Sequence, residues 1–244
     1  MTRFLATAAL AGLLLACAPP AQQASTEAEP PAAAAPAQIL APAGTYVIDP
    51  THANLQFRVN HLGLADYIAR FTRYSATLTL DPANIAASSI AFTVDPSSVR
   101  TDYPGNYRQT HAQSRFQSWD EDLSRSENFF NTGQFPEASF RSTAVEVTGA
   151  NTARVTGDLT FLGQTRPVTF DVTYGGSMAQ HPYTRAGAIG FSAKGTFNRS
   201  DFGNRFGLAQ GDSPGFLGDA VTIEFDGEFQ QQVAPAAPAE AAKQ

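Results

Sequence analysis

The sequence has little of three things that would point to common classes of protein. Cys17 is the only cysteine among 244 residues, so the chain cannot form an internal disulfide. The formal net charge is −6 and no Lys/Arg cluster is present, which makes the protein a poor binder of nucleic acid. The uncharged apolar run at residues 4–16 is too short to span a bilayer as a mature helix.

The first sixteen residues have the features of a signal peptide. Arg3 supplies a positive charge, the apolar run follows, and small residues then precede Cys17. We interpret residues 1–16 as a signal peptide and predict export. Residues 14–17 also resemble a bacterial lipobox, in which the cysteine is acylated and becomes the new N-terminus. The alternative is an ordinary signal peptide, cleaved near Ala16 or Ala18, with an incidental cysteine.

Lipidation would attach the chain to the periplasmic face of a membrane. A triacylated Cys17 would satisfy the need for more than one acyl chain in a stable anchor. Ala18 follows the cysteine, and by analogy with enterobacterial sorting the absence of aspartate there favours the outer membrane over the inner. Residues 17–43 are rich in Ala and Pro and predict a disordered tether, and residues 233–244 predict a disordered tail. Residues 44–232 have a length suited to one domain.

The pattern within 44–232 is alternation of apolar and polar residues, which predicts half-buried strands. Eight segments show it: 54–60, 73–80, 90–94, 138–147, 155–161, 168–174, 189–197 and 221–229. The phase shifts near Ser142, which indicates a bulge. Short turns at 148–152 and 162–167 predict antiparallel hairpins. A sandwich and a barrel both fit eight strands, and the strand lengths favour an all-β, eight-stranded antiparallel barrel.

One polar segment, residues 97–136, interrupts the alternation between the third and fourth strands. Ser118 followed by Glu121 predicts the N-cap of a short helix. A long insertion between strands is usually functional or disordered, and here we expect it to cap one mouth of the barrel.

Five motifs, in order, carry a resemblance to a known family. They are YVIDPTHANLQFRVNHLGLADYIARF (46–71), FFNTGQFPEASFRST (129–143), VTGDLTFLGQTRPVTFDV (155–172), FNRSDFG (197–203) and GDAVTIEFDGEF (218–229). Together they resemble the YceI-like, polyisoprenoid-binding family. The resemblance implies an exported lipocalin-like barrel with a long apolar lipid inside, such as an isoprenoid quinone or a prenyl phosphate.

The sequence departs from the family pattern in four places. Ala53 follows a histidine where serine is usual, Ala69 and Arg70 stand where glycine is common, and Asp122 replaces a common histidine. Residues 102–116 look like extra sequence. We expect these changes to lie at the barrel mouth and to alter the preference for a ligand head group.

Inward apolar side chains and one histidine are the candidate ligand-binding residues. They are Leu55, Phe57, Val59, His61, Leu78, Phe92, Phe129, Phe140, Phe161, Phe170, Phe191 and Phe225. For any one phenylalanine an ordinary core role is the alternative. His61 ends the first long strand, where it could donate to a quinone or phosphate oxygen or could instead bond to a turn. Arg199 and Asp201 are expected to pair and fix a strand end.

The sequence favours a binding protein over an enzyme. The four histidines show no metal-ligand spacing, and we predict no metal site and no cofactor. The GDSPG stretch at 211–215 fits a nucleophile elbow poorly, because no histidine follows it and loop residues surround it. With the lipobox-like cysteine, the resemblance to the YceI-like family implies a membrane-tethered carrier of an isoprenoid-like lipid. The alternative is a structural or stress-related envelope protein with a filled barrel. The pairing of two barrels into a homodimer is left open.

Overall fold

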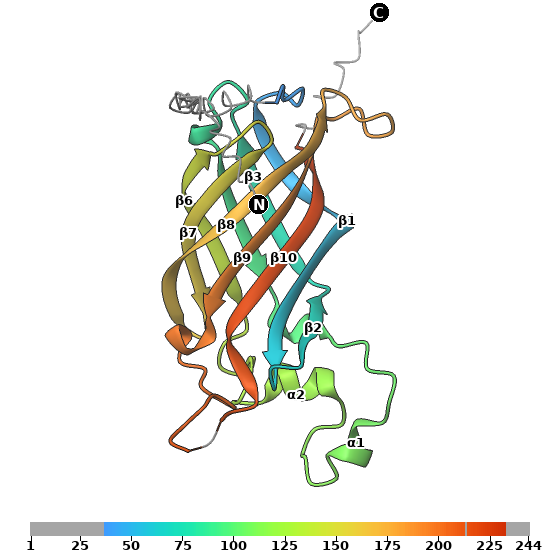
Figure 1. Ribbon diagram of the computed structural model, residues 1–244. Coiled ribbons are helices and arrows are strands. Elements are labelled where there is room, and N and C mark those ends of the chain that lie inside the picture. Colours follow the sequence, from blue (N-terminus) through green and yellow to red (C-terminus); the bar gives the residue numbers. More distant parts are fainter. Residues whose placement is uncertain (1–36, 213, 233–244) are drawn as a thin grey trace, which may run out of the picture. The chain divides into compact units, whose positions relative to one another are not determined.

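Eight antiparallel strands close into a barrel in the computed structural model, which describes residues 37–212 and 214–232 (Figure 1). The barrel strands are β1 (Gly44–His61), β3 (Tyr74–Leu80), β4 (Ser89–Val94), β6 (Ala138–Val147), β7 (Thr152–Phe161), β8 (Gln164–Met178), β9 (Ala188–Asn198) and β10 (Leu217–Gln231). Their spatial order is β10-β9-β8-β7-β6-β4-β3-β1, and β1 pairs again with β10. The prediction of an all-β, eight-stranded antiparallel barrel is confirmed.

Two short strands were absent from the prediction. β2 (Ala65–Phe71) pairs with the second half of β1, and β5 (Val99–Arg100) pairs with the end of β2. The first half of β1 pairs instead with β3. β1 therefore changes its neighbour along its length.

Register shifts interrupt the described barrel wall at four places, and two of them, in β1 and β6, are considered first. The register between β1 and β10 shifts between Ile48 and Ala53, so the intervening residues leave the ladder. In β6 the register shifts between Ser142 and Ala144, which confirms the predicted bulge. The Ser142 hydroxyl accepts a hydrogen bond from the backbone N–H of Ile90 at 2.9 Å. A side chain thus satisfies a β4 backbone donor beside the bulge.

The predicted hairpins are also confirmed. β6 pairs with β7 across the 148–151 turn, and β7 pairs with β8 across a two-residue turn. Leu162 and Gly163 in that second turn have φ values of 48° and 71°. Two successive positive φ angles match the right-handed twist of the flanking strands.

The segment between β4 and β6 covers one end of the barrel, which we call the α2 end (Figure 1). It holds the 3-10 turn Pro96–Ser98, β5, α1 (Tyr107–Thr110) and α2 (Trp119–Arg125). The Ser118 hydroxyl accepts from the Glu121 N–H at 3.1 Å, and the Glu121 carboxylate accepts from the Gln117 N–H at 2.8 Å. The predicted helix and its cap are therefore confirmed. Two further 3-10 turns are Ile85–Ala87 and Arg199–Phe202.

Residues 37–43 pack against the opposite end, which we call the N-terminal end. Ala41 is 1% exposed, and the Leu40 N–H donates to the Ser177 hydroxyl at 2.7 Å. The Tyr46 hydroxyl donates to the Pro42 carbonyl at 2.6 Å. The folded part thus begins before residue 44, the boundary that composition predicts. The predicted signal peptide, Cys17, most of the tether and the tail at 233–244 lie outside the described residues.

Two apolar clusters lie toward the two ends of the barrel. The cluster at the N-terminal end is centred on Tyr46 and Phe229, which are both fully buried. The cluster at the α2 end joins Phe57 and Val59 of β1 to Leu123 of α2. Within the part of the chain that the structure describes, no helix is long and apolar enough to cross a bilayer.

Candidate functional site

A cavity of about 820 Å³ runs along the barrel lumen between the two clusters. Its lining reaches Leu80 and Ile85 at the N-terminal end. At the α2 end it reaches His61, Tyr103 and Trp119, of which Tyr103 is 44% exposed. Its volume falls in the range of pockets that enclose small molecules. The barrel therefore contains an elongated and largely apolar chamber.

All twelve lumen residues predicted from the sequence line this cavity. They are Leu55, Phe57, Val59, His61, Leu78, Phe92, Phe129, Phe140, Phe161, Phe170, Phe191 and Phe225. That they bind a ligand stays a prediction. Cys17, the predicted lipidation site, lies outside the described residues.

The strand register explains why these side chains share one face. Leu55, Phe57 and Val59 alternate along β1, and Leu55 lies directly opposite Phe225 of β10. Directly paired residues of antiparallel strands point to the same face. The inward set of one strand therefore continues onto the next strand around the barrel.

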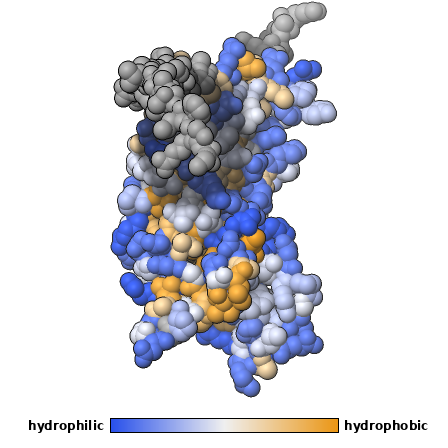
Figure 2. Space-filling model, in the orientation of Figure 1, coloured by the Kyte–Doolittle hydropathy of each residue, from blue (hydrophilic) through white to orange (hydrophobic). Residues whose placement is uncertain are grey.

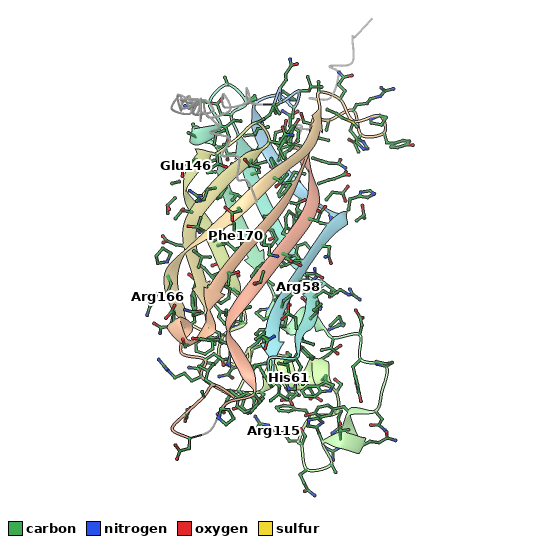
Figure 3. The ribbon with its side chains drawn as sticks, viewed as in Figure 1. Arg58, His61, Arg115, Glu146, Arg166 and Phe170 are labelled. Atoms are coloured by element: carbon green, nitrogen blue, oxygen red, sulfur yellow. The ribbon has the colours of Figure 1, made fainter. Side chains whose placement is uncertain are left out.

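Glycines on the inner wall make space for the phenylalanine rings. Gly195 of β9 pairs directly with Phe170 of β8, and a Cβ at Gly195 would lie 2.6 Å from the Phe170 ring. A Cβ at Gly157 would lie 2.5 Å from the Phe140 ring. Phe140 and Phe170 meet edge to face, with their ring centres 5.0 Å apart. The rings rest over the glycine backbone, and Figure 3 shows Phe170 at mid-height in the barrel.

The α2 end adds aromatic residues that the sequence prediction missed. Tyr67 and Phe71 come from β2, Trp119 from α2, and Phe130 from the segment after it. Phe130 packs against Phe57 with ring centres 5.8 Å apart. The alternation of Tyr67, Ala69 and Phe71 is the signal that could have revealed β2.

Several polar groups at this end have defined partners, but one buried side-chain atom of the described residues has none. The Asp122 carboxylate accepts from the Tyr107 hydroxyl at 2.6 Å, and Asp120 accepts from the backbone N–H and the hydroxyl of Thr101. Tyr67 is the exception: its hydroxyl is buried and has no hydrogen-bond partner among the described residues. Burial, with a contribution from the Asp120 carboxylate, raises the pKa of Tyr67 to about 12.

The hydrogen-bond partners of Arg199 differ from those predicted from the sequence. Its guanidinium donates to the backbone carbonyls of Gly218 and Leu217 and to Asn204 Oδ1, at 2.8, 3.1 and 2.6 Å. Asp201 is exposed and makes none of these bonds, so the expected Arg199–Asp201 pair is wrong. Arg199 still fixes a strand end, because it ties the turn after β9 to the start of β10. Desolvation lowers the pKa of this buried guanidinium.

His61 ends β1 at the α2 end, where Figure 3 labels it. Its ring centre lies 6.5 Å from that of Phe216, and the side chain is exposed. Four apolar side chains are exposed near this end: Leu62, Leu64, Ile68 and Phe216. Figure 2 shows apolar surface gathered in the same part of the face it displays. His61 thus stands at an apolar rim.

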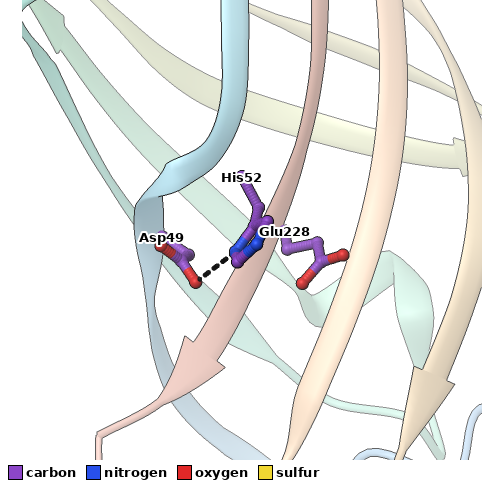
Figure 4. Close-up of side chains that lie close together, drawn as sticks. All are labelled: Asp49, His52 and Glu228. Atoms are coloured by element: carbon purple, nitrogen blue, oxygen red, sulfur yellow. Dashed lines mark hydrogen bonds and ion pairs between the residues drawn. The ribbon is translucent and has the colours of Figure 1, made fainter.

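A group of potential metal ligands lies on the outer wall. Oxygen and nitrogen atoms of Asp49, His52 and Glu228 come within 4.8 Å of one another at the bend of β1 (Figure 4). The Asp49 carboxylate also accepts from Thr51 and Gln230, and His52 Nδ1 lies 3.0 Å from it. Hydrogen bonds from His52 and Thr51 hold the Asp49 pKa well below its usual range. These bonds account for the arrangement without an ion, and the absence of a metal site stays a prediction.

The departures from the family pattern divide between two places. Ala69, Asp122 and the extra segment at 102–116 lie at the α2 end, as expected. Ala53 instead pairs with Gly227 and packs against the cluster at the N-terminal end. The expectation that all four changes share one mouth is therefore wrong for Ala53. Ser213 of the GDSPG stretch lies outside the described residues.

The fold and site define a closed antiparallel barrel with an apolar lumen. Residues 46–229 match the YceI-like domain, so the chain belongs to the YceI-like family. A UPF0312 protein of Pseudomonas fluorescens (strain SBW25) is 37% identical over 163 residues, which cover 66% of this chain and 77% of that protein. A UPF0312 protein of Shewanella oneidensis (strain MR-1) is 34% identical over 168 residues, covering 68% and 80% of the two chains.

Solved structures show the same fold at lower sequence identity. Burkholderia cenocepacia BcnA has a TM-score of 0.57 at 23% identity, and the match covers 74% of this chain and 98% of that one. A polyisoprenoid binding domain from Saccharophagus degradans, implicated in plant cell wall breakdown, has a TM-score of 0.53 at 13% identity. That match covers 78% of this chain and all of the other.

Proposed function

We propose that this protein binds an isoprenoid-like or other long-chain amphipathic lipid in the barrel lumen and shields its tail from water. The observation that carries the proposal is the apolar cavity of about 820 Å³, lined by phenylalanine rings along its length. The Saccharophagus degradans neighbour, described as a polyisoprenoid binding domain, supports the same ligand class. An isoprenoid quinone or a prenyl phosphate is the proposed cargo.

The barrel is long enough for an extended chain. β10 has 15 residues, which span roughly 50 Å at about 3.3 Å per residue. A strand tilt of about 35–45° leaves roughly 35–40 Å along the barrel axis. A lipid taken from a bilayer gains little hydrophobic energy on entering such a lumen, because its tail was already out of water. Fit, and the groups at the mouth, must therefore set selectivity.

We place the protein at the periplasmic face of a membrane, with the outer membrane preferred, attached through an acylated Cys17. The described chain starts at the N-terminal end, where the Ala37 N–H donates to the Ala150 carbonyl at 2.7 Å. Residues 17–36 could reach at most roughly 70 Å if fully extended. That reach exceeds the barrel length, so the α2 end could face either toward the anchoring membrane or away from it. Labelling with a radioactive fatty acid should mark the wild type and leave Cys17→Ala unlabelled.

Native mass spectrometry of the protein purified without detergent tests lipid binding directly. A blocking variant, Ala193→Trp, places a large side chain in the lumen, since Ala193 lines the cavity. Its matched control is Ser192→Trp, because Ser192 is the neighbouring residue on the outer face of β9 and is exposed. We expect a lipid-sized adduct on the wild type and on Ser192→Trp, and a reduced adduct on Ala193→Trp. A wild type that stays free of lipid when prenol, prenyl phosphate and quinone are added would refute the proposal.

The alternative function, a structural envelope protein with no ligand, requires a filled lumen. The cavity argues against a filled lumen, because aromatic rings lie along its wall and leave the chamber between them open. Failure of all three lipids to bind would restore this alternative.

A further inference from the structure

The unpartnered Tyr67 hydroxyl is the feature of the cavity that packing alone does not explain. Tyr67 lies directly opposite Val59 in the β1–β2 pair, so both side chains share the inner face. Tyr67 lines the cavity, and its buried hydroxyl oxygen has no hydrogen-bond partner within the part of the chain that the structure describes. The Thr101 hydroxyl lies on the same side, donates to Asp120 at 2.9 Å and acts to lower the pKa of Tyr67, but it forms no hydrogen bond of normal geometry with the Tyr67 hydroxyl. A buried polar group without a partner is uncommon and destabilising.

The Tyr67 phenol is neutral at physiological pH and keeps a proton that it can donate to a ligand oxygen. Burial and the Asp120 carboxylate raise its pKa to about 12, so the proton stays on the oxygen. An acceptor supplied by a ligand would relieve the missing hydrogen bond. The Tyr67 ring lines the cavity, and the Trp119 ring lies beside it with ring centres 6.4 Å apart.

The negative charge of Asp122 at this end of the cavity determines whether the ligand oxygen that Tyr67 bonds can be neutral or anionic. Asp122 lines the cavity, and its carboxylate is bonded to a neutral group, the Tyr107 hydroxyl, at 2.6 Å. Asp120 has Arg100 nearby, with Nε 3.9 Å from Oδ2, whereas Asp122 makes no ion pair among the described residues. An anionic head group at Tyr67 would face this uncompensated carboxylate, and like charges repel strongly where water is partly excluded.

We propose that Tyr67 anchors a neutral oxygen of the bound lipid, as in a quinone carbonyl or a prenol hydroxyl, and that Asp122 selects against phosphorylated lipids. The inference rests on the proposed lipid-binding function and names the head-group class that the site accepts. Arg199 is the competing feature, since it is cationic, 5% exposed and also lines the cavity. Its guanidinium, however, is engaged by two backbone carbonyls and Asn204.

Trp119 makes the test direct, because it is the only tryptophan of the chain and lines the cavity. A quinone that binds beside it should quench its fluorescence, and a competing lipid without a quinone ring should restore it. The probes are a ubiquinone, a prenol and a prenyl monophosphate with tails of equal length, added to the full chain. We expect the quinone and the prenol to bind at least about tenfold more tightly than the monophosphate, consistent with a site built around one hydrogen bond and one repelling charge.

Three conservative variants separate the roles. Tyr67→Phe should weaken quinone and prenol binding by roughly threefold to tenfold, the loss of one hydrogen bond, without destabilising the lipid-free protein. Asp122→Asn should tighten binding of the monophosphate by a few-fold and leave quinone affinity unchanged. Tyr74→Phe is the matched control, because the Tyr74 hydroxyl donates to the Ala53 carbonyl at 2.7 Å and Tyr74 is absent from the cavity lining.

The outcomes distinguish this inference from the proposed function. If none of the three lipids binds, lipid binding itself fails. If all three bind equally, or if Tyr67→Phe leaves quinone affinity unchanged, lipid binding stands and the inference is overturned. Tighter binding of the monophosphate than of the quinone would overturn it as well and would assign the head group to Arg199. A lipid-free Tyr67→Phe protein that is markedly less stable than the wild type would show that the hydroxyl already has a protein partner.

Discussion

The contact between Gly195 and Phe170 leads to a quantitative prediction about how the lumen stays open. A Cβ at Gly195 would lie 2.6 Å from Cδ1 of Phe170 and 2.9 Å from the backbone carbonyl oxygen of Thr169. Real side chains do not approach backbone this closely, so Gly195→Ala must move the ring, the strand pair or both. Since Phe170 lines the cavity, a displaced ring would turn into the lumen.

The magnitude follows from a comparison within one strand. Overpacking of a well-packed wall costs about 1–3 kcal/mol. Replacing glycine by alanine also restricts the unfolded chain, which stabilises the folded state by about 0.4–1 kcal/mol. Gly190 lies on the same strand, β9, and a Cβ there would meet nothing closer than 3.8 Å. Gly190→Ala therefore shares the favourable effect without the overpacking, and the two variants should differ by about 1–3 kcal/mol.

Equilibrium unfolding in urea, followed by circular dichroism, measures this difference. With a slope of about 1–3 kcal/mol per molar urea, the midpoints should be roughly 1 M apart, with Gly195→Ala the lower. Gly195→Ala should also reduce the lipid adduct seen by mass spectrometry, whereas Gly190→Ala should not. Equal stabilities would refute the reasoning, because they would mean that Phe170 does not rest on Gly195.

Two further predictions concern the outer wall and the α2 end. Hydrogen bonds from Arg58 and Lys194 lower the pKa of Glu224 to about 2, so its stabilisation is present above pH 4.5 and lost as pH falls toward 2. Because the three side chains are partly exposed to solvent, which screens the pairs, we expect Glu224→Gln to cost only about 1 kcal/mol at pH 7. Urea unfolding of the wild type and of Glu224→Gln at pH 7 and pH 3 checks this. A difference in unfolding free energy between the two proteins that does not shrink at pH 3 would contradict it. Ser118→Ala removes the N-cap of α2, which typically costs about 1 kcal/mol, and should speed amide hydrogen exchange in residues 119–125. Unchanged exchange there would show that other contacts hold the helix.

Much of the barrel could be predicted because its wall is built from one repeating rule. Alternation along β1 and β10 places Leu55 and Phe225 inward, and the register of the pair then keeps them on one face. The bulge at Ser142 and the cap at Ser118 were visible because each leaves a local signature, a shift of phase or a Ser-x-x-Glu pattern. Local rules of this kind need no knowledge of tertiary neighbours.

The α2 end was harder to predict because its contacts join distant parts of the chain. Tyr67 belongs to a short strand with only three inward-facing residues, which is a weak alternation signal. Its pairing with Val59 depends on the turn between β1 and β2. Arg199 bonds to Gly218 and Leu217, which are 19 and 18 residues away in sequence, and not to the nearby Asp201. Nothing in residue type or spacing distinguishes these two arrangements, since both satisfy the guanidinium.

The division between a predictable wall and a less predictable end has a functional consequence. The wall provides apolar surface, which accepts many tails with similar energy and so discriminates poorly among lipids. A site built around a hydrogen bond rejects a ligand that cannot complete it far more strongly than an apolar pocket rejects a change of size. Discrimination should therefore reside at the α2 end, where Tyr67 and Asp122 stand beside the 102–116 segment, and not among the phenylalanines. Replacing residues 102–116 by a shorter connection, as in relatives without the extra sequence, together with Asp122→His, should change head-group preference while leaving the lumen and its capacity for a tail intact.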